Sequence, residues 1–244
     1  MKQFITLYLL IIQPFLINAQ KKIGNFNDNG QKIGIWKTYN AYGKLLELAH
    51  YDNDKKNGEW KSYDNDEKLL EAGYYKNDVK TGEWTSYYKD NSQLHVKETY
   101  VNGELDGESI AYHKNGQVRS ISNYIKGEGE GEWKDYYENG QLEEIGALEN
   151  GDKTGEWKYY HENGNLASIG KYKNNDATGE WIVYYESGKV ESISNYRNKG
   201  QNAEVKNYHE NGKVKSLEYY KNEEKSGVWK TYDENGKLIE TKKY

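Results

Sequence analysis

Histidine is the side chain in this sequence best suited to metal binding or acid–base chemistry, and three histidines share one repeat position. His113, His161 and His209 follow one another at intervals of 48 residues. Imidazoles are common zinc ligands, but the ligands of one zinc ion lie within a few ångströms of each other. In a repetitive chain this interval predicts separate structural units, so we interpret the three as half-exposed strand residues.

Oxygen-rich segments offer a second chemistry, calcium binding, at residues 27–30, 52–54 and 64–66. Each alternates Asp and Asn, and oxygen ligands at alternate positions suit this ion. None continues to the distal glutamate of an EF-hand loop, and hairpin turns need the same residues. The chain also has no cysteine, no Gly-x-Ser-x-Gly elbow and no phosphate loop. We therefore predict turns here, and no enzyme, no cofactor and no metal site.

Aromatic side chains are the one feature with the chemistry of a binding surface. The chain contains 25 Tyr and 7 Trp. Exposed rings of these types stack on sugar rings and anchor peptide partners, although the same rings also serve packing alone. A structural role is favoured for the tryptophans, and a binding face is the alternative. The candidate binding-face aromatics are Trp60, Trp84, Trp133, Trp157, Trp181, Tyr137 and Tyr185.

These aromatics belong to a repeat of 24 residues that predicts a β-hairpin. A unit reads Gly-x-Trp, then a first Tyr, an Asn-Gly pair, a Leu or Val, a second Tyr and six polar residues. Asn-Gly between two such runs predicts a tight turn with both residues at positive φ, and the polar link predicts a looser turn. Nine units in series predict an all-β protein, an elongated single-layer antiparallel sheet of nine tandem hairpins. The units begin at Gly34, Gly58, Gly82, Gly107, Gly131, Gly155, Gly179, Ala203 and Gly227.

The spacing of the aromatics within a unit does not fit a flat strand. Trp and the first Tyr are three residues apart, whereas side chains alternate between faces with a period of two. Both faces then carry aromatics, or each strand contains a bulge or strong twist, or the chain is a β-solenoid with corners. The regular Asn-Gly pairs favour hairpins. Tryptophans of neighbouring units would be two strands, roughly 10 Å, apart, so we expect each to pack on the Leu, Val or Ile of the intervening strand and not on the next tryptophan.

The first nineteen residues differ from the rest and predict a secretory signal peptide. Lys2 precedes an apolar run, and Ile17-Asn18-Ala19 forms a cleavage site before Gln20. An uncleaved membrane anchor is the alternative, but the run is short for a span of about 20 residues. Residues 20–33 resemble half a unit and predict an N-terminal cap, and residues 34–244 hold the nine repeats. We expect an exported protein, periplasmic, cell-surface or secreted, with no transmembrane span after cleavage.

The composition excludes some partners. Hydrophobic residues make up 35 % of the chain and charged residues 30 %, with a formal net charge of -5. Because this mild acidity is interspersed, it argues against nucleic acid and anionic membranes as partners.

The segment from Gly131 to Leu142 reads Gly-Glu-Trp-x-x-Tyr-Tyr-x-Asn-Gly-x-Leu, which closely resembles the MORN-variant repeat of bacteria. The resemblance extends over the whole mature chain. It implies a single-layer sheet of hairpins that serves as a scaffold or interaction surface, with lipid binding in some members, and it implies no reaction. Bacterial members are often described as antitoxin-like, but a signal peptide would remove this chain from any cytoplasmic toxin.

Three functions therefore remain open at this stage. The leading one is a non-enzymatic exported scaffold that binds a protein partner along a face or an open edge. The alternatives are an envelope glycan or cell-wall binding module that uses the Trp and Tyr rows, and an antitoxin-like immunity protein.

Overall fold

The structure is a computed structural model that describes residues 20–197 and 200–244. The predicted signal peptide, residues 1–19, lies outside the described residues. Within them the chain forms 21 strands and no helix. The strands are β1 (Lys21–Phe26), β2 (Lys32–Tyr39), β3 (Leu45–Asp52), β4 (Lys55–Tyr63), β5 (Leu69–Lys76), β6 (Val79–Tyr87), β7 (Leu94–Val101), β8 (Glu104–Leu105), β9 (Gly107–Tyr112), β10 (Val118–Ile125), β11 (Glu128–Gly129), β12 (Gly131–Tyr136), β13 (Leu142–Glu149), β14 (Asp152–Tyr160), β15 (Leu166–Lys173), β16 (Asp176–Tyr184), β17 (Val190–Arg197), β18 (Asn202–Tyr208), β19 (Val214–Lys221), β20 (Glu224–Tyr232) and β21 (Leu238–Lys243).

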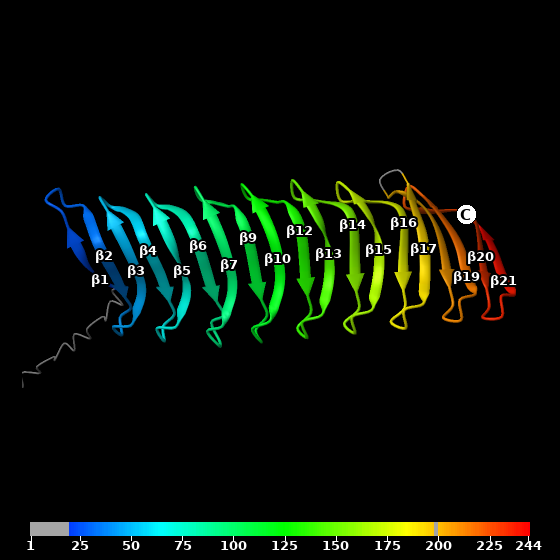
Figure 1. The fold of residues 1–244 in the computed structure, drawn as a ribbon, viewed down its shortest axis with the longest axis horizontal. Coiled ribbons are helices and arrows are strands. Elements are labelled where there is room, and N and C mark those ends of the chain that lie inside the picture. Colours follow the sequence, from blue (N-terminus) through cyan, green and yellow to red (C-terminus); the bar gives the residue numbers. More distant parts are fainter. Residues whose placement is uncertain (1–19, 198–199) are drawn as a thin grey trace, which may run out of the picture.

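Consecutive strands lie side by side in one open antiparallel sheet, which confirms the predicted all-β array of hairpins (Figure 1). β1 pairs with β2 at one end, and β21 pairs with β20 at the other. Two first strands are interrupted for one residue, so that β8 and β9 both pair with β7, and β11 and β12 both pair with β10. With each pair counted as one strand, nine hairpins follow β1.

The two kinds of turn are the reverse of the sequence-based prediction. At Asn115-Gly116 only the glycine has a positive φ, 86°, in a four-residue turn in which Gly116 N–H donates to the His113 carbonyl at 2.9 Å. The links between units are the tight turns: Asn53 and Asp54 both have positive φ, 48° and 67°. Two residues at positive φ match the right-handed twist of the strands that they join. The polar links therefore continue the strands almost to the turn.

The three-residue spacing places Trp and the first Tyr on opposite faces of an unbulged first strand, so the alternative in which both faces carry aromatics is correct. Each hairpin also contains a bulge in its second strand, and the solenoid alternative is wrong. In unit five Asp135 is opposite Glu144 and Tyr136 is opposite Leu142, which leaves Glu143 as an extra residue. A second irregularity occurs where neighbouring units meet, next to each Gly-x-Trp. Each extra residue changes the face to which the following side chains point.

The sheet consequently has two faces with different side chains. The tryptophan face carries the Trp of each unit, the residue two positions after it and the second Tyr. The isoleucine face carries the first Tyr, the Leu or Val after the turn, and the aliphatic residue three positions further on. The buried hydrophobic residues are all small or lie on the tryptophan face: Trp36, Ala49, Trp84, Ala111, Trp157 and Trp181.

Hydrogen bonds between neighbouring units fasten both ends of the strands. At the turn side, Asn115 Nδ2 donates to the Glu138 carbonyl at 2.7 Å, one unit further on. At the link side, Lys153 N–H donates to Asn175 Oδ1 at 2.7 Å. Each unit is thus stabilised by its neighbours, as in other linear repeat proteins.

Candidate functional site

Most tryptophans of the candidate binding face lie flat on a glycine of the preceding strand. A Cβ atom on Gly146 would lie 2.1 Å from Cδ2 of Trp157. The indole Nε1–H of Trp157 donates to the Ala147 carbonyl at 3.2 Å, and the side chain is 0 % exposed. The same arrangement joins Gly24 to Trp36, Gly73 to Trp84 and Gly170 to Trp181. Among the candidates Trp84, Trp157 and Trp181 are therefore inaccessible to a ligand in this conformation.

We call the glycine on which the indole lies the glycine seat. The glycine of Gly-x-Trp allows the backbone conformation that brings the indole onto it. Three residues, Gly155 to Trp157, lie opposite the single residue Gly146, and Gly155 has a φ of 67°, a conformation that residues with a Cβ rarely adopt. In unit eight, Ala203 and Val205 replace Gly and Trp, and β18 pairs with β17 without a shift in register. The bulge between units is kept in unit four, where Gly107 remains but Ser109 replaces the tryptophan, so it accompanies the glycine and not the indole.

A lysine four residues before the tryptophan covers several of these aromatic pairs. The Lys80 ammonium lies 3.8 Å from the ring centroid of Trp84 and 5.1 Å from that of Tyr100, and it forms an ion pair with Glu71 at 2.9 Å. Five lysines take this position over an indole: Lys32, Lys56, Lys80, Lys153 and Lys225. Such cation–π contacts contribute about 0.5–1 kcal/mol each at exposed sites.

Burial shifts the acid of one of these clusters away from its ordinary pKa. Glu144 is paired with Lys153 at 3.2 Å. Burial raises the pKa of the Glu144 carboxyl, the positive charge of Lys153 lowers it, and the carboxylate of Asp135 raises it again, so that the net shift is upward. Glu144 thus lies on the tryptophan face between Lys153 of the link to unit six and Asp135 of the preceding strand.

Trp60 and Trp133 lack the glycine seat and are half-buried. Ala49 and Ser122 occupy the seat position, and the indole N–H groups donate to carboxylates: Trp60 to Glu47 at 2.6 Å, and Trp133 to Asp135 at 3.1 Å. Burial raises the pKa of Glu47, but hydrogen bonds from Lys56 and Trp60 outweigh it and the net shift is downward.

The expectation that neighbouring tryptophans do not touch is wrong at Trp60, whose ring centroid lies 5.4 Å from that of Trp84. The expected packing on Leu, Val or Ile of the intervening strand is wrong as well, because the bulges place those residues on the other face. On the tryptophan face, the residue beneath the indole is a glycine in four units, so the ring lies directly on the backbone.

The two candidate tyrosines connect neighbouring units. The hydroxyl groups of Tyr137 and Tyr185 donate to the carbonyls of Tyr160 and Tyr208, both at 2.7 Å. The histidines at the same repeat position replace the hydroxyl with Nε2, as His161 does toward the Tyr184 carbonyl at 3.0 Å. Because a carbonyl accepts, Nε2 carries the proton. The described residues contain no group of three His, Asp or Glu side chains that could hold a metal ion.

Unit four, with Ser109 in place of Trp, leaves a groove of about 450 Å³ on the tryptophan face. Its floor is made of the small buried residues Ser109, Ala111 and Ser122. Its walls carry one positive and three negative side chains together with an indole: Arg119, Glu98, Asp135, Glu143 and Trp133. On β7, beside the groove, burial and a 2.9 Å hydrogen bond from the Tyr100 hydroxyl to Glu98 raise the pKa of Tyr100 to about 12.

The isoleucine face carries an apolar row across three adjacent strands. Ile169, Ile182 and Ile193 are directly opposite one another in β15, β16 and β17. On both sides of this row the line continues with a lysine, Lys158 beside Ile169 and Lys206 beside Ile193. A shorter aliphatic pair on the same line is Ile110 opposite Ile121. A depression of about 620 Å³ next to Ile193 is lined by Gly188, Lys189, Val190, Ile193, Tyr208, Glu210, Asn211 and Gly212.

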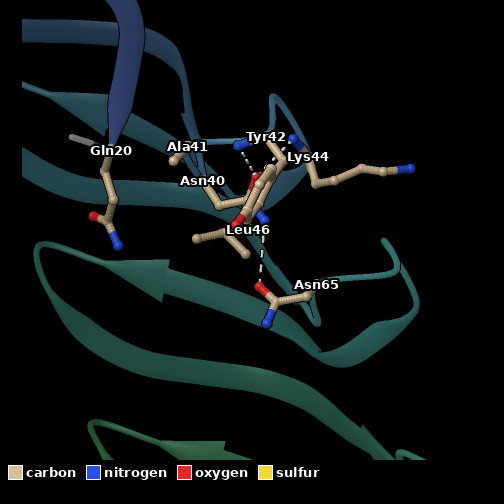
Figure 2. Close-up of a pocket in the computed structure, with 7 residues that line it drawn as sticks. All are labelled: Gln20, Asn40, Ala41, Tyr42, Lys44, Leu46 and Asn65. Atoms are coloured by element: carbon tan, nitrogen blue, oxygen red, sulfur yellow. Dashed lines mark hydrogen bonds between the residues drawn. The ribbon is translucent and has the colours of Figure 1, made fainter. Parts of the chain in front are cut away.

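A further pocket of about 540 Å³ lies at the turn of the first hairpin (Figure 2). Asn40 organises this turn, because its Oδ1 accepts from Tyr42 N–H at 2.9 Å and from Lys44 N–H at 3.0 Å. Tyr42 is 88 % exposed, and Leu46 supplies apolar surface beside it. The pocket lining includes two titratable side chains, Tyr42 and Lys44.

Sequence reasoning identified the aromatic rows but missed the lysines that cover them and the groove. One signal was available: in units one, two and five a glutamate stands nine residues before the lysine, as Glu71 before Lys80. The groove had only the missing tryptophan at Ser109 as a signal, because its walls come from strands that are distant in sequence.

Comparisons with known proteins agree with the hairpin repeat. The family model described as MORN repeat variant matches residues 32–53, 56–77, 105–126, 129–150, 153–174, 177–198, 201–222 and 225–244. The segment without a match contains the extra residue of unit three. No curated protein is similar enough to be recognised as a relative.

Solved structures give only distant likeness. The GtfA/B complex bound to UDP and GlcNAc is 14 % identical with a TM-score of 0.23, over 56 % of this chain and 24 % of that chain. The TcdB2–TccC3 complex is 12 % identical with a TM-score of 0.22, over 92 % of this chain and 15 % of that chain. This chain thus spans less than a quarter of the length of either one. The family model matches more than half of the chain, and the chain belongs to the MORN repeat variant family.

Proposed function

We propose that this protein is a non-enzymatic repeat scaffold that binds a protein partner on its isoleucine face. The observation that supports it is the uninterrupted row Ile169, Ile182 and Ile193, half-exposed on a sheet with no second layer. Burial of aliphatic side chains is the main favourable term in protein association. The flanking Lys158 and Lys206 would form the polar rim of such an interface.

The open edges of the sheet are less suited to a partner. β1 begins with Lys21-Lys22, and β21 ends with Lys242-Lys243. Lysines on edge strands discourage pairing with other chains. The face therefore supports protein binding better than the edges do.

An envelope glycan is the alternative ligand, and the tryptophan face supports it weakly. Stacking on a sugar requires an open ring face, but Trp84, Trp157 and Trp181 are buried. A glycan array with wild-type chain and with Trp157→Ala and Trp181→Ala variants would detect such binding.

Export is a separate part of the proposal and rests on the sequence of residues 1–19. An exported chain would be periplasmic, on the cell surface or secreted, and would be kept apart from any cytoplasmic toxin, which speaks against an antitoxin-like role. Within the described residues, no helix is long and apolar enough to cross a membrane. Cell fractionation with N-terminal sequencing tests export, and a mature N-terminus at Gln20 is the expected result.

Affinity capture tests the partner surface. The tagged chain is incubated with an envelope extract of its own cells, with untagged chain as competitor. Ile182→Glu should reduce recovery of a specific partner at least about tenfold, because it places a charge in the apolar row. The matched control is Ala167→Glu, at the bulge position where two other units carry Glu143 and Glu191. Equal recovery by both variants, or no specific protein with the wild-type chain, would refute the proposal.

A further inference from the structure

The groove of unit four arises from three coordinated departures from the repeat. Ser109 replaces the tryptophan, Leu105 replaces the lysine four residues before it, and Glu98 replaces the glycine that would seat the tryptophan. Four other units fill this place with an indole on a glycine, as Trp84 does on Gly73. Without the indole a polar groove of about 450 Å³ remains.

In other units, a lysine ammonium group packs against the aromatic rings of the tryptophan face. Between units two and three, the Lys80 ammonium lies between the rings of Trp84 and Tyr100 and is bound by the Glu71 carboxylate at 2.9 Å. Lys153 repeats the arrangement over Trp157, with Glu144 as the carboxylate. A cation between aromatic rings and a carboxylate is therefore a recurrent occupant of the tryptophan face.

The groove keeps the groups that receive such a cation but has no lysine of its own. In the described part of the chain, Glu98, Asp135 and Glu143 form no ion pair. Arg119 is the one positive side chain in the lining, so that three carboxylates face one guanidinium. The groove therefore has a surplus of negative charge.

Trp133 is the aromatic wall of the groove, and its ring is half-buried. Of the seven tryptophans, all of which are described, it alone has neither an aromatic ring nor a lysine ammonium packed against it. Its Nε1–H is engaged by Asp135. This bond holds the indole beside the carboxylate, as a cation site requires.

We propose that the groove of unit four binds lysine or arginine side chains of an extended segment of a partner polypeptide. The walls lie on β7 and β12, about three strand spacings or roughly 14 Å apart. One basic side chain reaches Glu98, and a second reaches Asp135 beside Trp133. In an extended segment, residues i and i+4 point to the same side and lie about 13–14 Å apart, which matches the separation of the two walls. This site lies on the face opposite to the isoleucine row and does not depend on it.

Fluorescence anisotropy with short labelled peptides tests the site directly. The probe is a peptide of alternating Ser and Lys, compared with the same peptide acetylated on every lysine. We expect the cationic peptide to bind the purified chain at least about tenfold more tightly than the acetylated one. No binding, or equal binding of both peptides, would overturn the proposal. Because no partner is captured, this result is independent of the test of the isoleucine face.

Two matched variants separate the groove from diffuse attraction to an acidic chain. Glu98→Gln and Glu108→Gln each remove one negative charge near Ser109, but Glu108 precedes Ser109 and points to the opposite face. Glu98→Gln should weaken binding at least about fivefold, and Glu108→Gln should leave it unchanged. Equal losses would mean that only net charge matters and would contradict the proposal.

Rebuilding the repeat should close the groove. The double variant Glu98→Gly/Ser109→Trp restores the glycine seat and its indole, and it should abolish peptide binding while the thermal midpoint is kept or raised. Retained binding would place the peptide elsewhere and overturn the assignment. Spermidine serves as a competitor: displacement of the peptide at equal concentration would show that the groove takes a free polyamine, which also contradicts a polypeptide ligand.

Discussion

The Trp181 ring packs directly on Gly170 and fills the space that a side chain at residue 170 would need. A Cβ atom added to Gly170 would lie 2.0 Å from Cδ2 of Trp181, and the indole N–H donates to the adjoining Lys171 carbonyl at 3.2 Å. The absence of a side chain at one residue therefore provides the space for the largest side chain at the other. Where alanine or serine stands instead, as at Ala49 and Ser122, the indole turns toward a carboxylate and is less buried.

Gly170→Ala should therefore destabilise the sheet more than an ordinary strand substitution. The new methyl group collides with the Trp181 ring, and overpacking of this kind costs about 1–3 kcal/mol. Urea unfolding followed by tryptophan fluorescence should show a lower midpoint. Ser194→Ala is the control, since Ser194 occupies the equivalent position opposite Val205 and already has a Cβ. An unchanged midpoint for Gly170→Ala would show that the indole can leave its seat without loss.

The hairpin array was predictable because its signals are local. A strand-length run, an Asn-Gly pair and a second run determine a hairpin, and their recurrence determines the series. The type of turn was not predictable, because Asn-Gly is compatible with several turn types. At Asn115-Gly116 only the glycine has a positive φ. The links looked loose because they are polar, yet pairing of Val101 with Glu104 closes them over two residues.

The candidate site was predictable only in part, because its contacts cross between units. The aromatic rows could be identified from spacing, but a period of two does not reveal bulges such as Glu143, which place Leu142 and Ile145 on the same face. The groove needs Glu98 and Asp135 on opposite sides of Ser109, and these residues come from three different units. Only the register of the sheet brings them together.

Complete burial of Trp157 gives a second prediction. Trp157→Ala should lower the free energy of unfolding by about 3–5 kcal/mol, because a large, fully enclosed ring is lost. Trp133→Ala should cost clearly less, because that ring is half-exposed and has no aromatic neighbour. Chemical denaturation of both variants with hydrogen exchange by unit checks this order, and an equal loss for both would be inconsistent with the difference in burial.

The hydrogen bonds from tyrosine hydroxyl groups to the next unit give a third prediction. Tyr137→Phe removes a 2.7 Å hydrogen bond to the Tyr160 carbonyl and should cost about 1 kcal/mol. The loss should concentrate at the junction of units five and six, where hydrogen exchange should become faster at the turn side. Tyr42→Phe is the control, because that ring is 88 % exposed in its turn (Figure 2). Equal rates of hydrogen exchange at this junction in both variants would show that the Tyr137 hydrogen bond does not stabilise it.

Alkaline pH should weaken the sheet through buried tyrosines. Burial raises the pKa of Tyr172 from 10.0 to about 12. Between these values the unfolded chain loses this proton and the folded chain keeps it, so the free energy of unfolding falls as the pH rises. The stabilisation is complete below pH 10.0 and is lost as the pH approaches about 12. Urea unfolding across this window should show a smaller decline for Tyr172→Phe than for the wild-type chain. Parallel declines in the two proteins would show that Tyr172 does not couple ionisation to folding.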